Sequence, residues 1–126
     1  MQVLHNGNNN WVCVSNIGCQ TAEVNYYDSL FTADLKTSVK KQIASLMNET
    51  GPEIAVSVIP VQQQTNAVDC GPFSLAFATS LLNTDDPAQV VYNEARLREH
   101  LITSQKNNTL LPFPQETLPG ALPRRA

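Results

Sequence analysis

The sequence predicts an α+β domain whose central sheet is mostly antiparallel and flanked by helices. Stretches rich in β-branched and aromatic residues dominate the first third, and segments with helical spacing of apolar residues dominate the rest. Turn-forming residues separate these segments. Read in chain order, they form three strands, a helix, a fourth strand and two further helices, an order typical of α+β folds.

The first three predicted strands lie close together in the chain. Residues 1–5 form a short apolar run that ends in the turn-rich NGNNN, and residues 11–17, WVCVSNI, carry the strongest strand pattern. A hairpin connection then leads into a returning strand at residues 22–30, near whose end lies Asp28. The fourth strand, residues 53–61, is apolar enough that we expect it to be well buried.

The first predicted helix covers residues 34–47. Its apolar residues fall on one face, and Asp34 has the residue type preferred at a helix N-cap. The apolar positions are Leu35, Val39, Ile43 and Leu46.

Two more helices are predicted after the fourth strand. One starts near Cys70 and ends before Asp85, Asp86 and Pro87; the other covers residues 93–105. The residues expected on their buried faces are Phe73, Phe77, Leu81, Leu82, Leu97 and Leu101.

The length of 126 residues suggests one domain, which we place at residues 1–111. The remaining residues, 112–126, are rich in proline and are expected to form a partly disordered tail.

Composition argues against several classes of function. A net charge of −3 and a pI of about 5.2 lack the basic character of a nucleic-acid-binding protein. No apolar run is long enough to span a membrane, and nothing resembles a signal peptide. The three cysteines lack the spacing of a zinc site, so we expect no metal and no cofactor. We expect free thiols and a reducing, intracellular setting, either nuclear or cytoplasmic.

The segment PVQQQTNAVDCGPF, residues 60–73, holds the candidate active site. At a helix N-terminus, unpaired N–H groups and the helix dipole favour the thiolate form of Cys70. Gly71 allows a substrate backbone to approach closely. The side-chain amide of Gln64 and the backbone N–H of Cys70 are candidate donors to an oxyanion. The alternative is that Cys70 is a small core residue.

Three segments resemble boxes of the ubiquitin-like-protein proteases, the desumoylase and deneddylase family related to adenovirus protease. QQQTNAVDCGPF resembles the cysteine box, NWVCVSNIG the box in which a His-Trp pair opens a strand, and VNYYDSL the box that ends the next strand. The resemblance covers roughly residues 1–105 and looks closest to versions carried by mobile genetic elements. It implies a papain-like or adenain-like cysteine peptidase fold with the nucleophile at a helix N-terminus.

The resemblance also implies roles for single residues. Cys70 matches the nucleophile, Gln64 the oxyanion donor, and Asp28 the residue that orients a histidine. Trp11 matches an aromatic that lines a narrow slot over the Gly-Gly end of the substrate. The alternative is that Trp11 is a core residue and Asp28 a turn residue at a strand end.

The family pattern is broken at position 10, where Asn10 stands in place of the expected histidine. An amide has no useful basicity, so Asn10 is unable to take a proton from Cys70. Two histidines remain. His5 matches a non-catalytic place in the pattern, although a substitute role as base stays open, and His100 is expected to be an amphipathic surface or boundary residue on a late helix.

A second break is the segment that family members carry upstream of the His-Trp strand, because this chain starts almost at that strand. We therefore expect a fragment, a compact relative, or a protein that gains the missing surface from a partner. In each case an exposed apolar face would favour self-association. Three functional hypotheses follow. They are a cysteine peptidase that cleaves a ubiquitin-like protein or a polyprotein, a non-catalytic binding module for a ubiquitin-like protein, and a structural or assembly protein with this fold.

Overall fold

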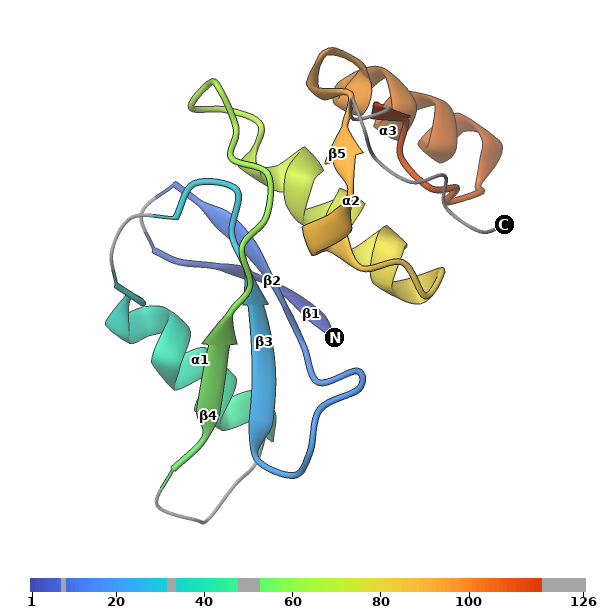
Figure 1. Cartoon of the computed structure of the whole chain (residues 1–126). Coiled ribbons are helices and arrows are strands. Elements are labelled where there is room, and N and C mark those ends of the chain that lie inside the picture. Colours follow the sequence, from blue (N-terminus) through green and yellow to red (C-terminus); the bar gives the residue numbers. More distant parts are fainter. Residues whose placement is uncertain (8, 32–33, 48–52, 117–126) are drawn as a thin grey trace.

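The computed structural model describes all residues except 8, 32–33, 48–52 and 117–126. Its main sheet has four strands in the order β1-β2-β3-β4 (Figure 1). The pairs β1–β2 and β2–β3 are antiparallel, and β3–β4 is parallel. The α+β prediction with a mostly antiparallel sheet is therefore confirmed. The strands are β1 Gln2–His5, β2 Trp11–Ser15, β3 Glu23–Tyr27 and β4 Ala55–Val58.

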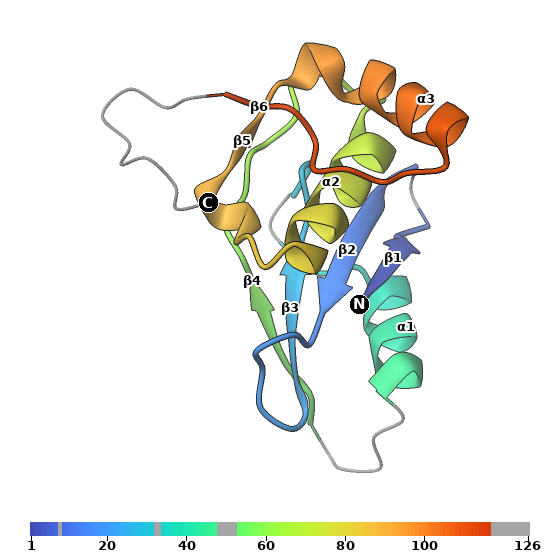
Figure 2. The ribbon, with the colours of Figure 1, turned by 90° about the vertical axis from the view of Figure 1, so that its right-hand side faces the viewer.

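Helices cover both faces of this sheet, α1 (Thr37–Met47) on one and α2 (Cys70–Leu82) on the other (Figure 2). Alternate residues of a strand point to opposite faces, and the two apolar clusters follow this rule. Val12 and Tyr26 pack on the α1 side, whereas Cys13 and Tyr27 pack on the α2 side. The two buried layers hold the central strands between the helices. The start of β2 and the end of β3 are therefore fixed relative to the start of α2.

The fourth strand differs from its prediction. Residues 55–58 form the edge strand β4, and Ala55, Ser57 and Val58 are exposed. An edge strand has a neighbour on one side only, so apolar composition alone does not bury it. The expectation of a well-buried strand was wrong for this reason.

Helix α1 begins at Thr37 rather than directly after Asp34. Val39 and Ile43 are buried as predicted, but Leu46 is half exposed near the end of the helix.

Helix α2 starts at Cys70, in agreement with the sequence. Phe73 and Phe77 are fully buried, whereas Leu82, at the last position of the helix, is exposed. The helix also buries hydroxyl groups. Ser74 and Thr79 donate to carbonyls one turn earlier in the helix, at 2.8 and 2.7 Å. These bonds remove the cost of burying the two hydroxyls.

The C-terminal elements pack against α2. They comprise the 3-10 turns η1 (Pro87–Gln89) and η2 (Glu94–Arg96), the helix α3 (Leu97–Asn107), and a two-stranded sheet of β5 (Val91–Tyr92) and β6 (Gln115–Glu116).

The expected domain boundary at residue 111 does not coincide with the end of this packing. Phe113 is only 2% exposed and belongs to the same apolar cluster as Phe73 and Phe77. The fold therefore extends at least to Glu116, and residues 117–126 of the expected tail lie outside the described part of the chain. Among the described residues, none of the helices has the length and apolar character needed to cross a bilayer.

The burial of Phe113 yields a test of this boundary. Replacing Phe113 with alanine leaves a cavity in the core, and we expect the free energy of unfolding to fall by about 3–5 kcal/mol. Leu111→Ala is the matched control, because Leu111 is 57% exposed, and its effect should stay within about 0.5 kcal/mol. Urea unfolding of both variants measures the difference. Equal stability of the two variants would contradict the placement of Phe113 in the core.

Candidate active site

Three connecting segments meet at one end of the sheet: the turn between β1 and β2, the segment after β3, and the loop before α2 (Figure 1). Cys70 is the first residue of α2 and is buried. Its Sγ donates to the backbone carbonyl of Asn9 at 3.6 Å. Asn9 has φ of 56°, in the left-handed region that asparagine tolerates better than most residues. The thiol is thus held against the turn that carries position 10.

Asp28, just after β3, is the buried acceptor at the centre of this region. One carboxylate oxygen accepts from Asn10 Nδ2 at 3.0 Å and from the backbone N–H of Leu30 at 2.9 Å. The other accepts from the Tyr26 hydroxyl at 2.8 Å. These bonds compensate for the burial of a carboxylate and bring together residues 10 and 28, which the sequence places in separate boxes.

Asn10 is only 3% exposed, and only one of the two polar atoms of its side-chain amide makes a hydrogen bond among the described residues. Nδ2 donates to Asp28, whereas Oδ1 is buried without a hydrogen-bond partner among the described residues. Such an unpaired acceptor costs roughly 1–3 kcal/mol. The amide therefore makes the bond to Asp28 that an imidazole N–H would make, but its other end is a neutral oxygen without useful basicity.

Tyr26 is a member of the site that sequence reasoning missed. Burial raises the pKa of its hydroxyl well above the usual range, and the hydrogen bond to the Asp28 carboxylate raises the pKa further. The hydroxyl therefore stays protonated and donates to Asp28 at any working pH. A signal was present in the sequence, because residues 26 and 28 stand two apart at a strand end and so share a face.

Gln64 lies in the loop before α2, but its contacts differ from the expected ones. Its Oε1 accepts from the Ser29 hydroxyl at 2.6 Å, and its Nε2 donates to the Asn66 carbonyl at 2.6 Å. Among the described residues, the hydrogen bonds of this amide do not include one to the Cys70 sulfur. One Nε2 hydrogen makes the bond to Asn66, which leaves the second hydrogen of the same group for another acceptor.

Gln63 binds the same strand end and was also missed. Its amide donates to the Asp28 carbonyl at 2.9 Å and accepts from the Phe31 backbone N–H at 3.0 Å. No local sequence pattern predicts either bond, since the partners are more than thirty residues apart.

Trp11 opens β2 and is 44% exposed, so it is not a core residue. Its ring lies beside the start of α2, because a Cβ added to Gly71 would stand 3.9 Å from Trp11 Cδ1. That is an ordinary contact distance, so the fold itself does not demand glycine here. The exposed indole thus lies against Gly71, the residue that follows Cys70 in the chain.

The two histidines are engaged elsewhere. His5 contacts the edge of Trp11, with ring centroids 4.9 Å apart, and its Nδ1 accepts from the Gly7 backbone N–H at 3.0 Å. His100, on α3, lies against Phe113 and makes a 2.8 Å hydrogen bond to the Leu111 carbonyl. His100 therefore belongs to the packing of the C-terminal segment, as expected for a boundary residue.

The described residues contain no group of three or more side chains suited to holding a metal ion. Cys13, Cys19 and Cys70 are free thiols.

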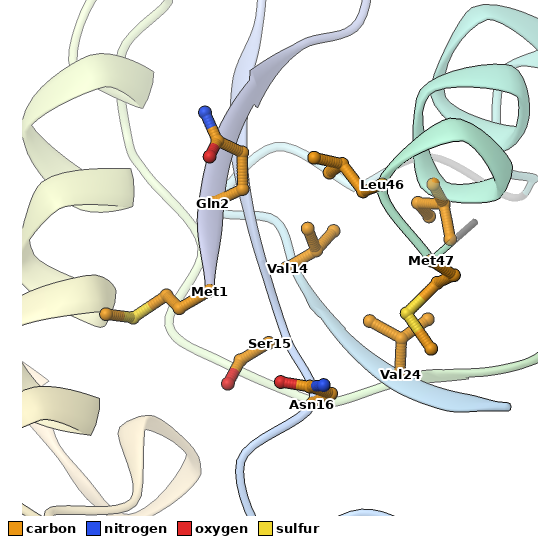
Figure 3. A pocket seen from close by; sticks show the side chains of 9 residues that line it. Met1, Gln2, Val14, Ser15, Asn16, Val24, Leu46 and Met47 are labelled. Atoms are coloured by element: carbon orange, nitrogen blue, oxygen red, sulfur yellow. The ribbon is translucent and has the colours of Figure 1, made fainter. Parts of the chain in front are cut away.

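A cavity of about 140 Å³ lies at the opposite end of the sheet from Cys70, where the start of β1, the end of β2 and the end of α1 meet (Figure 3). Val14, Val24, Leu46 and Met47 contribute apolar side chains to its lining. The polar side chains of Gln2, Ser15 and Asn16 also belong to the lining, which contains no cysteine, histidine or carboxylate. We therefore place the candidate active site at the other end of the sheet.

Comparison with known proteins supports the assignment to the cysteine-peptidase class. The family model described as "RickCE-like, catalytic domain" matches residues 1–97. It falls in the clan of the ubiquitin-like-protein proteases. The matched region includes every candidate site residue named above. No curated protein and no solved structure matches the chain.

The hydrogen bonds at Asp28 make it a stability determinant. Asp28→Ala leaves the buried donors of Asn10, Tyr26 and Leu30 without an acceptor, and we expect a loss of about 3 kcal/mol or more in the free energy of unfolding. Urea denaturation measures this loss. Asp34→Ala, outside this network, is the control and should change stability little. A loss no larger than that of the control would contradict the buried network.

The cysteines should differ in reactivity. Burial raises the pKa of the Cys13 thiol to about 12, so only about one molecule in ten thousand carries its thiolate at pH 8. We expect iodoacetamide to label Cys70, at a helix N-terminus, at least about tenfold faster than Cys13 in the native protein. Timed labelling followed by peptide mass spectrometry measures both rates, and equal rates in native protein would count against this assignment. In denaturant the two rates should converge.

Proposed function

This chain belongs to the RickCE-like catalytic-domain family, and we propose that it recognises the C-terminal glycine end of a ubiquitin-like protein but hydrolyses it poorly or not at all. It is a cysteine-peptidase-like domain. The observation that carries the proposal is the 3.0 Å bond from Asn10 to Asp28, beside the turn that contacts the Cys70 sulfur. An amide occupies the position where hydrolysis by a cysteine nucleophile needs a base.

The proposed chemistry, were a base present, is acyl transfer through a thioester. The base takes the thiol proton of Cys70, the sulfur attacks the carbonyl carbon of the terminal glycine, and the leaving amine receives the proton. Water then cleaves the thioester and releases the carboxylate. The Cys70 backbone N–H and the remaining Gln64 N–H are the proposed donors to the oxyanion.

The rest of the site does not replace the base, because its contribution to the rate is too small. General acid–base catalysis typically contributes about 10²–10⁴ in rate, and loss of the histidine of a serine-protease triad costs about 10⁶. A helix dipole stabilises a neighbouring charge by at most about 2 kcal/mol, which is roughly thirtyfold. Asp28 only orients and stabilises an imidazolium, and it has no imidazole to act on.

The contacts of His5 argue against a substitute role. Because Nδ1 accepts the Gly7 N–H, the proton of the neutral ring lies on Nε2. Neither nitrogen then has a free lone pair for the Cys70 proton, and the ring packs against Trp11 instead. We therefore assign His5 to the support of the indole.

The exposed Trp11 beside Gly71 supports binding of a glycine-ended segment. In the proposed complex a Gly-Gly end lies against the indole, because glycine carries no side chain that would meet the ring. The proposed partner is a ubiquitin-like protein or a polyprotein with such a segment, in the reducing interior of a cell. The free thiols fit that setting.

The decisive test is Asn10→His. The introduced imidazole is expected to donate one N–H to Asp28 and turn its other nitrogen toward Cys70. Hydrolysis of a fluorogenic ubiquitin-like C-terminal conjugate should rise by at least about 10² over the natural sequence. Initial rates for a panel of such conjugates, measured side by side for both proteins, give the result.

Two controls make this experiment interpretable. Cys70→Ala in the Asn10→His background should abolish the gained turnover, whereas His5→Ala, which removes a contact to the indole but no base, should not abolish it. If the natural sequence already turns over well and His5→Ala abolishes that activity, His5 is the base and the proposal is wrong. If no conjugate is bound by either protein in a direct binding titration, the proposed recognition is wrong as well.

A further inference from the structure

The loop before Cys70 is held from outside by a group of charged and polar side chains. Thr65 donates to the Glu94 carboxylate from both its backbone N–H and its hydroxyl, each at 2.9 Å. Asn66 donates to Asp69 at 2.6 Å and to Glu94 at 3.3 Å. The loop is therefore tied to η2, an element about thirty residues later in the chain.

Arg98, in the first turn of α3, completes this attachment at the residues directly before Cys70. Its Nε donates to Asp69 Oδ1 at 2.8 Å, and its Nη2 donates to the Val68 carbonyl at 2.6 Å. The fork geometry of guanidinium permits both bonds at once. Arg98 thus fixes two consecutive residues whose positions set the start of α2.

The bond to Asp69 also has an electrostatic consequence. The Asp69 side chain is only 10% exposed, and it stands at the N-cap position of α2 without making a side-chain capping bond. Its negative charge thus belongs to the residue directly before Cys70, a thiol whose reactive form is an anion. A guanidinium 2.8 Å away offsets that charge, and without it the carboxylate would weaken the positive potential that the N-terminus of α2 presents to the thiol.

We infer that Arg98 is a positioning residue for Cys70: it neutralises Asp69 and holds the loop so that the N-terminus of α2 favours the thiolate. It does not touch the sulfur and acts through Asp69. This role rests on the proposed function of Cys70 as the nucleophile. Arg98 lies just beyond the matched residues 1–97, so the family match does not assign it.

Other charged or titratable groups lie around the same end of the sheet. They are Glu94 in η2, whose carboxylate binds Thr65 and Asn66, Asp28 after β3, and His5 at the end of β1. None of them has a hydrogen bond or ion pair to Arg98 among the described contacts, so a change at position 98 acts first on Asp69.

The test measures how the rate of Cys70 alkylation depends on pH. Iodoacetamide labelling of the whole chain between pH 5 and 10, followed by peptide mass spectrometry, gives the midpoint of the pH–rate profile. We expect Arg98→Gln to raise this midpoint by about half a unit to one unit, which lowers the rate at pH 7 by about threefold to tenfold. Adding Asp69→Asn to Arg98→Gln removes both charges and should return the midpoint close to its original value.

Matched controls separate this role from a merely structural one. Arg96→Gln removes the neighbouring arginine, which forms only an exposed pair with Glu99 at 3.9 Å, and should leave the profile unchanged. Labelling of the buried Cys13 reports opening of the fold in each variant. If Arg98→Gln exposes Cys13, Arg98→Lys replaces it, since lysine retains the charge and should retain the midpoint.

The inference is overturned by any of three results: an unchanged midpoint in folded Arg98→Gln, an equal shift in Arg96→Gln, or a raised midpoint in folded Arg98→Lys. Failure of the double variant to restore the midpoint overturns the part played by Asp69. Alkylation requires no substrate and no base. An inactive Asn10→His variant would therefore contradict the proposed function without affecting this result.

Discussion

The buried carboxylate of Asp28 is the interaction on which this end of the molecule depends. It accepts hydrogen bonds from the turn before β2, from β3 itself and from the segment after β3, through Asn10, Tyr26 and Leu30. The loop before α2 joins the same residue, because the Gln63 side chain donates to the backbone carbonyl of Asp28. A buried charge is tolerated only when it is well paired, so these segments are required to converge on one point. The thiol of Cys70 stands beside that point.

This arrangement explains how the fold accommodates an asparagine at position 10. The bond to Asp28 needs a donor, and both an amide and an imidazole supply one. Loss of the second ring nitrogen removes the proton acceptor but leaves the hydrogen-bonded framework in place. Among the described residues, the cost at this position is one buried oxygen, Asn10 Oδ1, without a hydrogen-bond partner. Structure and catalysis therefore place separate demands on position 10, and the present residue meets only the structural demand.

The environment of the Cys70 thiol depends both on its local sequence and on residues distant in the chain. The local sequence starts a helix at Cys70, and the dipole of that helix acts on the thiol. The adjoining Asp69 acts in the opposite sense, and its charge is offset from α3 by Arg98. The C-terminal third of the chain is therefore more than a cover for the core, because Glu94 and Arg98 hold the loop whose end carries the nucleophile candidate.

The sequence by itself determined the fold class and the helix start at Cys70. These features follow from short-range patterns, namely alternation, helical spacing and turn residues. The family resemblance of the sequence also predicted that a base is lacking at position 10. Only the tertiary structure decided that β4 is an exposed edge, that Phe113 joins the core, and that Gln64 is bound by Ser29 and Asn66. The contributions of Tyr26 and Arg98 emerged there too. Such features depend on which distant segments meet, and local propensity does not encode that information.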